Sequence, residues 1–406
     1  MPRRRWLPSL AARVLFMGNR HIKTLILMVV LSFPGHLALA ETESSGAASQ
    51  SKWIISSGSS ANLPSGSMLS LALALERGSE AIWLDMVMSK DDHIVLLADS
   101  RIDQLTDVKE IYPDRSRADG SYYSFDFTLE ELRGLSLLPG SPGESARSVP
   151  LSRSHLSITA LDDFLGYLDL VFTDLAARPT LVCVLKHGWR HKEEDKNLGA
   201  TALKALEDYQ STSAGAALVI GSYDPEELQL LAQSAADSGR PKNLGLMQLI
   251  GGDNGEEVKR FEFGSFQPYS YDLLFTRFGL KSVSSYADSI GMDPDTIIDE
   301  SGALSQPRFL DDARTLGLKI VLCRADSTPR YPIVEGPAPE ALFEYLLFTI
   351  GFDGIVTGRD RQARNWLNNR ASADINKQNE IIERLIDHIE ESGSEPPAPV
   401  KSDTTM

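Results

Sequence analysis

The sequence is poor in cysteine and in basic residues, and it has no glycine-rich loop of the kind that cradles nucleotide phosphates. It contains 2 cysteines among 406 residues, and no Cys/His pattern has the spacing of a metal site. Lys and Arg total 40 against 56 Asp and Glu, which gives a formal net charge of −16. This acidic balance argues against nucleic acid or an anionic membrane surface as a partner.

An apolar run of the roughly 20 residues that a membrane-spanning helix needs is missing from the start of the chain. The run there, Leu25–Leu31, is shorter; basic residues precede it and Ala38-Leu39-Ala40 follows. This order predicts a signal peptide over residues 1–40, cleaved after Ala40, and therefore a secreted or periplasmic protein whose mature chain has no transmembrane span. An uncleaved anchor is the alternative. Cleavage removes six basic and no acidic residues, which lowers the formal net charge from −16 to −22.

No internal repeat is visible, so the architecture is inferred from the order of apolar runs. Eight strands are expected, at Trp53 to Ser56, Ala81 to Met88, Leu181 to Lys186, Ala217 to Tyr223, Leu244 to Ile250, a weak one near Tyr286 to Ile290, Lys319 to Cys323 and Gly354 to Thr357. Helical patterns lie between them, at Met68 to Arg77, Leu161 to Leu175, Ala200 to Tyr209, Pro225 to Ala236, Pro307 to Leu316 and Pro339 to Ile350. Alternating strands and helices predict an α/β fold, a (β/α)8 TIM barrel over residues 52–370.

Two long loop insertions interrupt this pattern, residues 99–160 after strand 2 and residues 251–280 after strand 5. In a barrel both leave the strand ends where ligands bind, so we expect them to form a wall or lid over the mouth. The alternative is that their aromatic residues simply pack the insertions onto the barrel.

The ends of the chain are expected to lie outside the barrel. Residues 41–51 are predicted to be a linker and residues 392–406 a disordered tail, because both are small and polar or rich in Ser, Pro and Glu. Between the barrel and that tail, the spacing of isoleucines over residues 371–391 predicts a C-terminal amphipathic helix.

A lone acid interrupts the second predicted strand. Strand side chains alternate, so Asp85 faces the same way as Trp83 and Val87. The pattern of residues from Glu80 to Leu132 that contains this strand resembles the glycerophosphodiester phosphodiesterase family, most closely its periplasmic bacterial branch. Further agreement is found at Leu63-Pro64, Lys186 with Trp189 and His191, Ser222-Tyr223-Asp224, Gln248-Leu249-Ile250, Tyr286 to Gly291 and Gly354 to Thr357.

The resemblance implies a TIM barrel that hydrolyses glycerophosphodiesters to glycerol 3-phosphate and an alcohol. In the family, three carboxylates are thought to hold a divalent cation such as Ca²⁺ or Mg²⁺, and two histidines act as general acid and base. Hard cations need several oxygen ligands, and proton transfer near neutral pH suits imidazole.

The family's chemical motifs are nevertheless altered in this chain. A His-Arg-Gly motif is replaced by Ser56-Ser57-Gly58, Glu-x-Asp by Trp83-Leu84-Asp85, His-Asp by Ala98-Asp99, and a Glu two residues before a Lys by Val184-Leu185-Lys186. The resemblance therefore implies no catalytic residue, because the family's histidine positions are Ser56 and Ala98. No cofactor is expected; Asp85 remains as a weak metal ligand, since Trp83 and Val184 stand at the other two ligand positions.

Four residues at these positions are ligand-binding candidates: Ser57, Lys186, Trp83 and Asp99. Each has a structural alternative. Lys186 pairs with Asp85, since a buried charge needs a partner; Trp83 fills the vacated volume; and Asp99 caps the following loop. The serine-rich stretch that begins at Ser56 either cradles an anion or forms a flexible turn.

The two cysteines lie in separate predicted strands, and export would permit a disulfide. Cys183 alternates away from Lys186, whereas the resemblance places Cys323 toward the barrel interior, so two buried thiols are expected rather than a bridge.

Three functions stay open. The first is an exported pseudoenzyme that binds a phosphorylated polyol, a glycerophosphodiester or a protein partner at the barrel mouth. The second is an active phosphodiesterase with relocated catalytic groups, for which His93, His187 and His191 are the candidates and Ca²⁺ or Mg²⁺ the cofactor. The third is a non-catalytic envelope protein that binds a partner.

Overall fold

The computed structural model describes residues 52–58, 63–138, 156–172, 178–212, 217–237, 239, 243–251, 255–299, 301–326 and 339–373. The predicted signal peptide, linker and tail lie outside these residues, as does most of the helix predicted over residues 371–391. Its first three residues, 371–373, continue a helix that begins at Asp360.

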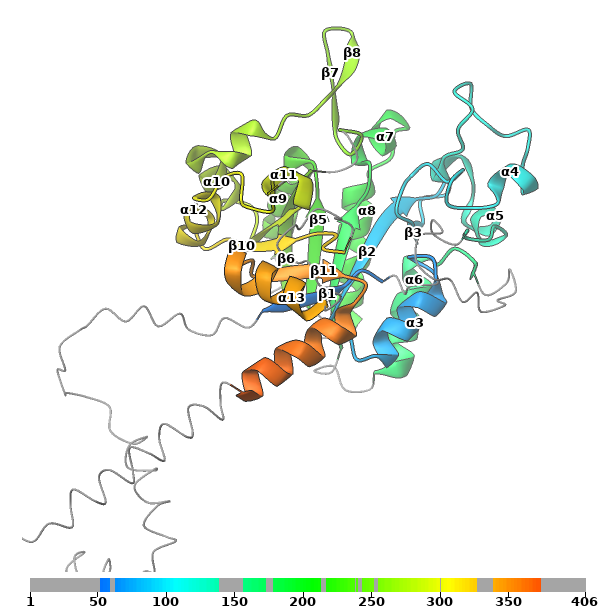
Figure 1. Ribbon diagram of the computed structural model, residues 1–406. Helices are drawn as coiled ribbons and strands as arrows, with labels where there is room; N and C mark the ends of the chain where they lie inside the picture. The colour runs from blue at the N-terminus through cyan, green and yellow to red at the C-terminus, as the bar shows by residue number, and fades with distance from the viewer. Residues whose placement is uncertain are drawn as a thin grey trace, which may run out of the picture. The chain divides into compact units, whose positions relative to one another are not determined.

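A closed parallel barrel forms the centre of the molecule (Figure 1). Its eight strands are β1 (Trp53–Ser56), β2 (Ala81–Met88), β4 (Thr180–Leu185), β5 (Leu218–Ser222), β6 (Leu244–Ile250), β9 (Ser289–Met292), β10 (Lys319–Leu322) and β11 (Gly354–Thr357). Neighbouring strands follow chain order, and β1 pairs in parallel with both β11 and β2, which closes the sheet. The predicted (β/α)8 barrel is therefore confirmed.

Helices cover the outside of the barrel. They are α3 (Met68–Glu76), α6 (Leu161–Val171), α8 (Leu198–Thr212), α9 (Pro225–Asp237), α10 (Arg277–Val283), α11 (Pro294–Ile297), α12 (Phe309–Thr315), α13 (Pro339–Glu344) and a π-helical turn, η5 (Tyr345–Ile350). Gly317 and Gly351 follow two of these helices with positive φ, the conformation that favours glycine after a helix end.

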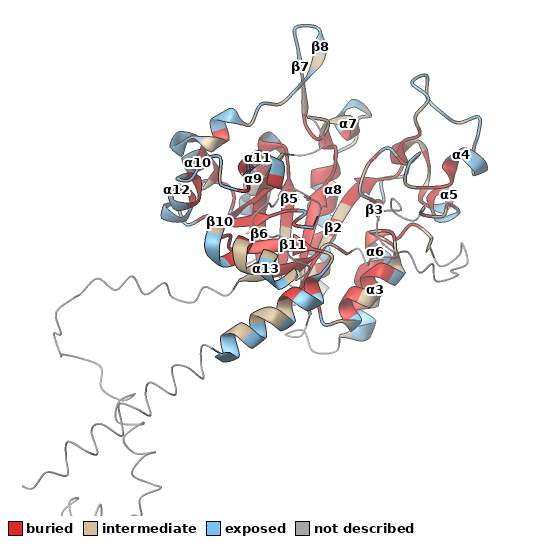
Figure 2. Ribbon diagram, in the orientation of Figure 1, coloured by how far each residue is buried: buried red, intermediate tan, exposed pale blue. Residues whose placement is uncertain are grey.

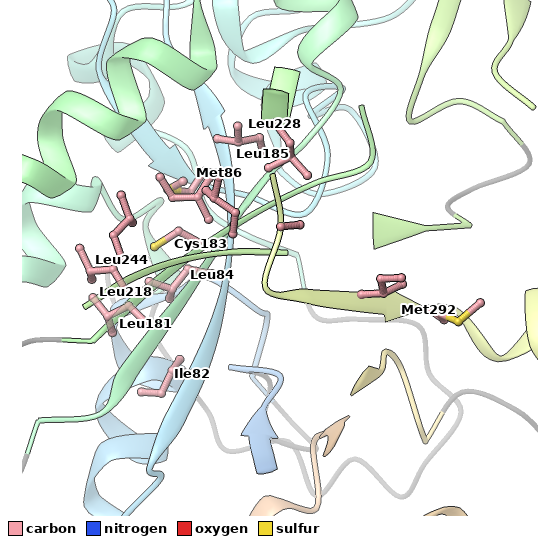
Figure 3. Close-up of a cluster of buried hydrophobic side chains, with 14 of the residues drawn as sticks. Ile82, Leu84, Met86, Leu181, Cys183, Leu185, Leu218, Leu228, Leu244 and Met292 are labelled. Carbon is pink, nitrogen blue, oxygen red and sulfur yellow. The ribbon is translucent and has the colours of Figure 1, made fainter. Parts of the chain in front are cut away.

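Because side chains alternate along each strand, the barrel strands contribute to two separate cores. One face of β2 and β4, including Leu84 and Cys183, packs against the helices, and Figure 3 shows this cluster. The other face points into the barrel, where Val182, Val184 and Cys323 are buried. Figure 2 shows the strands as the most buried part of the molecule. Both cysteines are buried and free, as predicted.

The sixth strand lies further along the chain than predicted. It was expected near Tyr286 to Ile290, but the structure places it at Ser289–Met292. The reason is that Tyr286 and Ala287 still bond back to Val283 at the end of α10. The chain joins the sheet at Asp288, whose N–H donates to Leu246 O.

Both predicted insertions are present and contain ordered elements. After β2 the chain forms β3 (Ile94–Leu96), α4 (Val108–Ile111), η1 (Ser124–Asp126) and α5 (Leu129–Arg133). Residues of β3, α4 and α5 form a small separate core together with Val87 of β2. After β6 it forms the hairpin β7 (Lys259–Glu262) and β8 (Ser265–Pro268), followed by η4 (Asp272–Phe275). Figure 1 shows this hairpin projecting from the barrel beside α7 (Gly188–Glu193). No helix within the described residues is long and apolar enough to cross a bilayer.

Candidate functional site

The carboxyl ends of the barrel strands bring the predicted site residues together. Asp85 in β2 is the register partner of Val184 in β4, and the backbone N–H of Lys186 donates to Met86 O. The charges of Asp85 and Lys186 both act on the pKa of the buried Cys323. The candidates therefore share one mouth, where ligands of such barrels bind.

Trp83 and Asp85 form a pair within β2. The indole Nε1–H donates to Asp85 Oδ1 at 2.9 Å, and the Trp83 ring packs against the apolar cluster inside the barrel. Val184, at the neighbouring strand position, is fully buried. Filling of the vacated volume, the structural alternative for Trp83, agrees with this packing.

These residues do not fit the divalent cation that the family implies. Asp85 accepts from an indole N–H, and its neighbours Trp83 and Val184 offer no side-chain oxygen. Across the described residues no group of three or more His, Cys, Asp and Glu side chains is placed to hold a metal. Since hard cations need several oxygen ligands, Asp85 with these two neighbours does not make a divalent-cation site.

Lys186 forms a buried ion pair with Glu257, which comes from the insertion after β6. Lys186 Nζ contacts Glu257 Oε1, and the Glu257 side chain is 1% exposed. Burial alone would raise the pKa of Glu257, but the charges of Lys186 and His187 outweigh it and hold that pKa below its ordinary value. The pairing of Lys186 with Asp85 stays a prediction beside this contact.

His187 follows Lys186 in a left-handed conformation, with φ +52°, and lies beside this ion pair. Its Nδ1 is 3.2 Å from Asp99 Oδ1, its Nε2 is 3.8 Å from Glu257 Oε2, and its side chain is 3% exposed. Burial lowers the pKa of His187 more than the two carboxylates raise it. Asp99 also accepts from Arg101 N–H at 2.8 Å, so the predicted loop cap is present.

The other two histidines have different surroundings. His191 is fully buried; its Nε2 accepts from Met88 N–H at 3.0 Å, which leaves Nδ1–H to donate to His187 O at 3.1 Å. Burial lowers the pKa of His191 to about 4, so the ring is neutral and structural. His93 lies in the exposed turn before β3, with Nε2 4.0 Å from Asp91 Oδ2.

The two positions that the resemblance assigns to the family's histidines, 56 and 98, carry serine and alanine. Ser56 is buried at the end of β1, and the backbone N–H of Ser57 donates to Thr357 O at 3.1 Å. Gly58 follows with φ +63°. Ala98 is exposed just after β3.

Two polar clusters attach the hairpin to the mouth. The first is centred on Glu256, which binds Arg190 and Lys259 through its side chain and accepts from Trp189 Nε1–H at 2.8 Å through its backbone. Arg190 also donates to Tyr123 OH at 3.3 Å, so α7 joins both insertions. The expected lid over the mouth is consistent with these contacts.

The second cluster is the ion pair between Asp224, just after β5, and Arg260 in β7. Both guanidinium nitrogens of Arg260 reach the carboxylate, at 2.5 and 3.1 Å, and the Asp224 side chain is 3% exposed. Tyr271 OH adds a bond to Tyr223 O at 3.1 Å.

Glu257, Asp224 and Arg260 were not among the site residues predicted from the sequence. A usable signal was present for Glu257: a lysine at a strand end needs an acid, and two adjacent glutamates begin the aromatic-rich insertion at the same mouth. No comparable pattern pointed to Arg260, because an arginine in a hairpin is ordinarily a solvated residue.

An eight-stranded parallel barrel with polar groups gathered at the carboxyl ends of its strands defines a TIM-barrel protein with its site at that mouth. The sequence profile of the glycerophosphoryl diester phosphodiesterase family matches residues 57–358, and the chain belongs to that family.

Named relatives agree with this assignment. A Haemophilus influenzae protein called glycerophosphodiester phosphodiesterase is 29% identical over 247 residues, which cover 58% of this chain and 66% of that protein. A Treponema pallidum protein of the same name is 27% identical over 262 residues, covering 61% and 72%. The chain thus spans about two thirds of the length of these relatives.

A solved structure supports the fold. A protein from Silicibacter pomeroyi, provisionally designated a glycerophosphoryl diester phosphodiesterase, superimposes with a TM-score of 0.52 at 18% identity. The match covers 79% of this chain and 95% of that one. At this identity the likeness concerns the fold alone.

Proposed function

We propose that this protein is a pseudoenzyme of its family, which binds a glycerophosphodiester or a related phosphorylated polyol at the barrel mouth without hydrolysing it. One observation carries the proposal: Asp85, the one that remains of the three metal-binding carboxylates implied by the resemblance, accepts from the indole of Trp83 instead of standing beside two further carboxylates. Neither a metal nor an acid–base pair is supplied at the positions where the family's chemistry takes place.

We further propose that the protein acts outside the cytoplasm. The basic and short apolar segments before Ala40 support a cleaved signal peptide, and the ligand would then be met in a secreted or periplasmic setting.

A second candidate function is hydrolysis by relocated groups, and the contact between His187 and Asp99 favours it. A histidine oriented by a carboxylate is a common general base. Against it, the His187 side chain is 3% exposed, and its two ring nitrogens face Asp99 and Glu257 of the same chain, so neither is open to a substrate while Glu257 is in place. Ca²⁺ or Mg²⁺ would be the cofactor of this alternative.

The test is titration calorimetry of the full chain with glycerophosphocholine and sn-glycerol 3-phosphate, paired with a hydrolysis assay in EDTA, Ca²⁺ or Mg²⁺. We expect binding without turnover in all three conditions. The proposal would be overturned if the unmodified protein showed metal-dependent turnover. In that case His187→Ala should lose the turnover and the surface control His93→Ala should keep it. Absence of both binding and turnover would favour the envelope interaction protein instead.

A further inference from the structure

Three nitrogen atoms of Lys186 and His187 face one internal carboxylate at the barrel mouth. Glu257 Oε1 contacts the Lys186 ammonium, while Oε2 lies 3.4 Å from the backbone nitrogen of His187 and 3.8 Å from its Nε2. The Lys186 ammonium also lies 5.2 Å from the centre of the Tyr223 ring. An ammonium, a backbone N–H and an imidazole form a donor set that suits the oxygens of a carboxylate or a phosphate.

The hairpin has other attachments besides this ion pair. Asp224 and Arg260 already attach β7 to the end of β5, and Glu256 already attaches the base of the hairpin to α7. A buried ion pair also contributes little net stability, because desolvation of both charges offsets their attraction. The position of Glu257 therefore calls for an explanation other than anchoring.

The other cations of the mouth differ in the origin of their partners. Arg324, after β10, binds Asp293 after β9 at 3.0 Å, and Arg359, after β11, lies 3.9 Å from Asp326 after β10. Asp293 directly follows β9, and Asp326 lies four residues after the end of β10. Glu257 instead belongs to an insertion, so its movement away from Lys186 would involve that insertion and not a barrel strand.

We propose that Glu257 is a tethered occupant of an anion site formed by Lys186 and His187, and that a phosphate group binds there when this carboxylate leaves. The inference deepens the proposed function, on which it rests for the class of ligand. Exchange of one anion for another keeps Lys186 paired, so the buried cation is never left without a counter-charge. Affinity for phosphate is accordingly reduced by competition from Glu257.

The test compares Glu257→Gln with Glu262→Gln, a matched control at the exposed tip of the same hairpin. Inorganic phosphate is titrated into each protein by calorimetry. We expect phosphate to bind Glu257→Gln at least tenfold more tightly than the parent, and Glu262→Gln to match the parent. Addition of Lys186→Met to Glu257→Gln should abolish the gain. Equal affinity of the parent and a folded Glu257→Gln would overturn the proposal.

A second measurement covers the case in which Glu257→Gln does not fold. Trp189 donates to Glu256 O and its ring lies 5.0 Å from Phe266, so its fluorescence reports the position of the hairpin. Phosphate added to the parent should change this emission saturably, and Trp189→Phe should remove the change. An emission that stays constant up to high phosphate concentrations would then count against displacement.

The two proposals fail separately. If Glu257→Gln binds phosphate but neither it nor the parent binds a glycerophosphodiester, the anion site stands and the proposed ligand class is wrong. If the parent hydrolyses glycerophosphodiesters, the pseudoenzyme proposal fails while the phosphate titration still decides the role of Glu257.

Discussion

At the scale of single residues, burial decides what the histidines of this barrel do. His191 uses both ring nitrogens for backbone groups, Met88 N–H and His187 O, and has no exposed surface. Its position near the mouth made it a candidate for a relocated catalytic group. However, both ring nitrogens already bond to the backbone, so neither is free to bind a ligand.

The buried His191 predicts a specific loss of stability in acid. Its pKa is about 4 in the fold against 6.5 as the ordinary value, so the unfolded chain binds the extra proton between these limits. The contribution of the neutral His191 ring to the free energy of unfolding is fully present above pH 6.5 and is lost as the pH falls toward 4. Between pH 7 and pH 4 this residue should cost about 3 kcal/mol of unfolding free energy.

Urea unfolding at both pH values checks this prediction by comparing the parent with His191→Gln. Glutamine can also accept from Met88 N–H and donate to His187 O, but it does not titrate. The variant should therefore lose about 3 kcal/mol less than the parent over this range. The same loss in both proteins would show that other groups control the acid sensitivity.

The part of the candidate site that lies on barrel strands could be predicted from the sequence. The alternation of Trp83, Asp85 and Val87, and the position of Lys186 at a strand end, follow from strand geometry alone. The partner of Lys186 does not, because Glu257 lies 71 residues further along the chain and its approach depends on how an insertion folds back. Strand periodicity carries no information about such a contact.

At the scale of elements, the β7–β8 hairpin has a costly turn. Phe263 and Gly264 both have positive φ, at +52° and +84°, as a two-residue type I′ turn requires. Glycine tolerates this conformation and phenylalanine does not, and Phe263 is 100% exposed, so no packing offsets the strain. Phe261 differs, because its ring pairs with Phe266 across the hairpin at 5.3 Å.

Replacement of Phe263 by asparagine should therefore stabilise the hairpin by about 1 kcal/mol, since Asn-Gly is the preferred sequence for this turn. Amide hydrogen exchange over residues 259–268 measures the effect, which should appear as slower exchange. The control Phe261→Asn should accelerate exchange, because it removes the contact with Phe266. Unchanged or faster exchange in Phe263→Asn would contradict the assignment of strain to this residue.

Element types were more predictable than element ends. Apolar runs with β-branched residues marked all eight barrel strands, but the sixth was placed too early because Tyr286 and Ala287 fit a strand pattern while they complete the last turn of α10. Likewise the helix predicted over Pro339 to Ile350 ends as the π-helical turn η5, which hydrophobic spacing does not distinguish from an α-helix.

At the scale of the whole molecule, charge restricts the partners. The formal net charge is −16 for the full sequence and −22 without residues 1–40. The cations described at the mouth lie beside carboxylates of the same chain; they are Lys186, Arg324, Arg359, Arg190, Lys259 and Arg260. A large basic surface for polyanions is therefore not formed there.

We accordingly expect the mature protein not to bind DNA or anionic liposomes at about 0.15 M salt, where the Debye length is about 8 Å. Co-sedimentation with liposomes and a DNA mobility shift assay measure this. Retention that weakens as salt is raised would reveal an electrostatic surface that the charge balance does not predict.

The resemblance implies that catalysis depends on the whole barrel, because the implied groups come from several strand ends. Five positions would have to change together, and the substitutions are Ser56→His, Ser57→Arg, Trp83→Glu, Ala98→His and Val184→Glu. Groups that serve one transition state are not additive, so Ser56→His alone should stay inactive.

The combined variant should regain cation affinity before it regains turnover. Glutamates at 83 and 184 would flank Asp85, since residue 184 is its register partner on the neighbouring strand. Val184→Glu alone buries an unpaired charge at a fully buried position and should destabilise the fold by several kcal/mol. In the combined variant a shared cation offsets that charge, so Ca²⁺ should raise its melting temperature and leave the parent unchanged. Thermal melts with and without Ca²⁺ measure this, and an equal response of parent and combined variant would mean that the cation binds elsewhere.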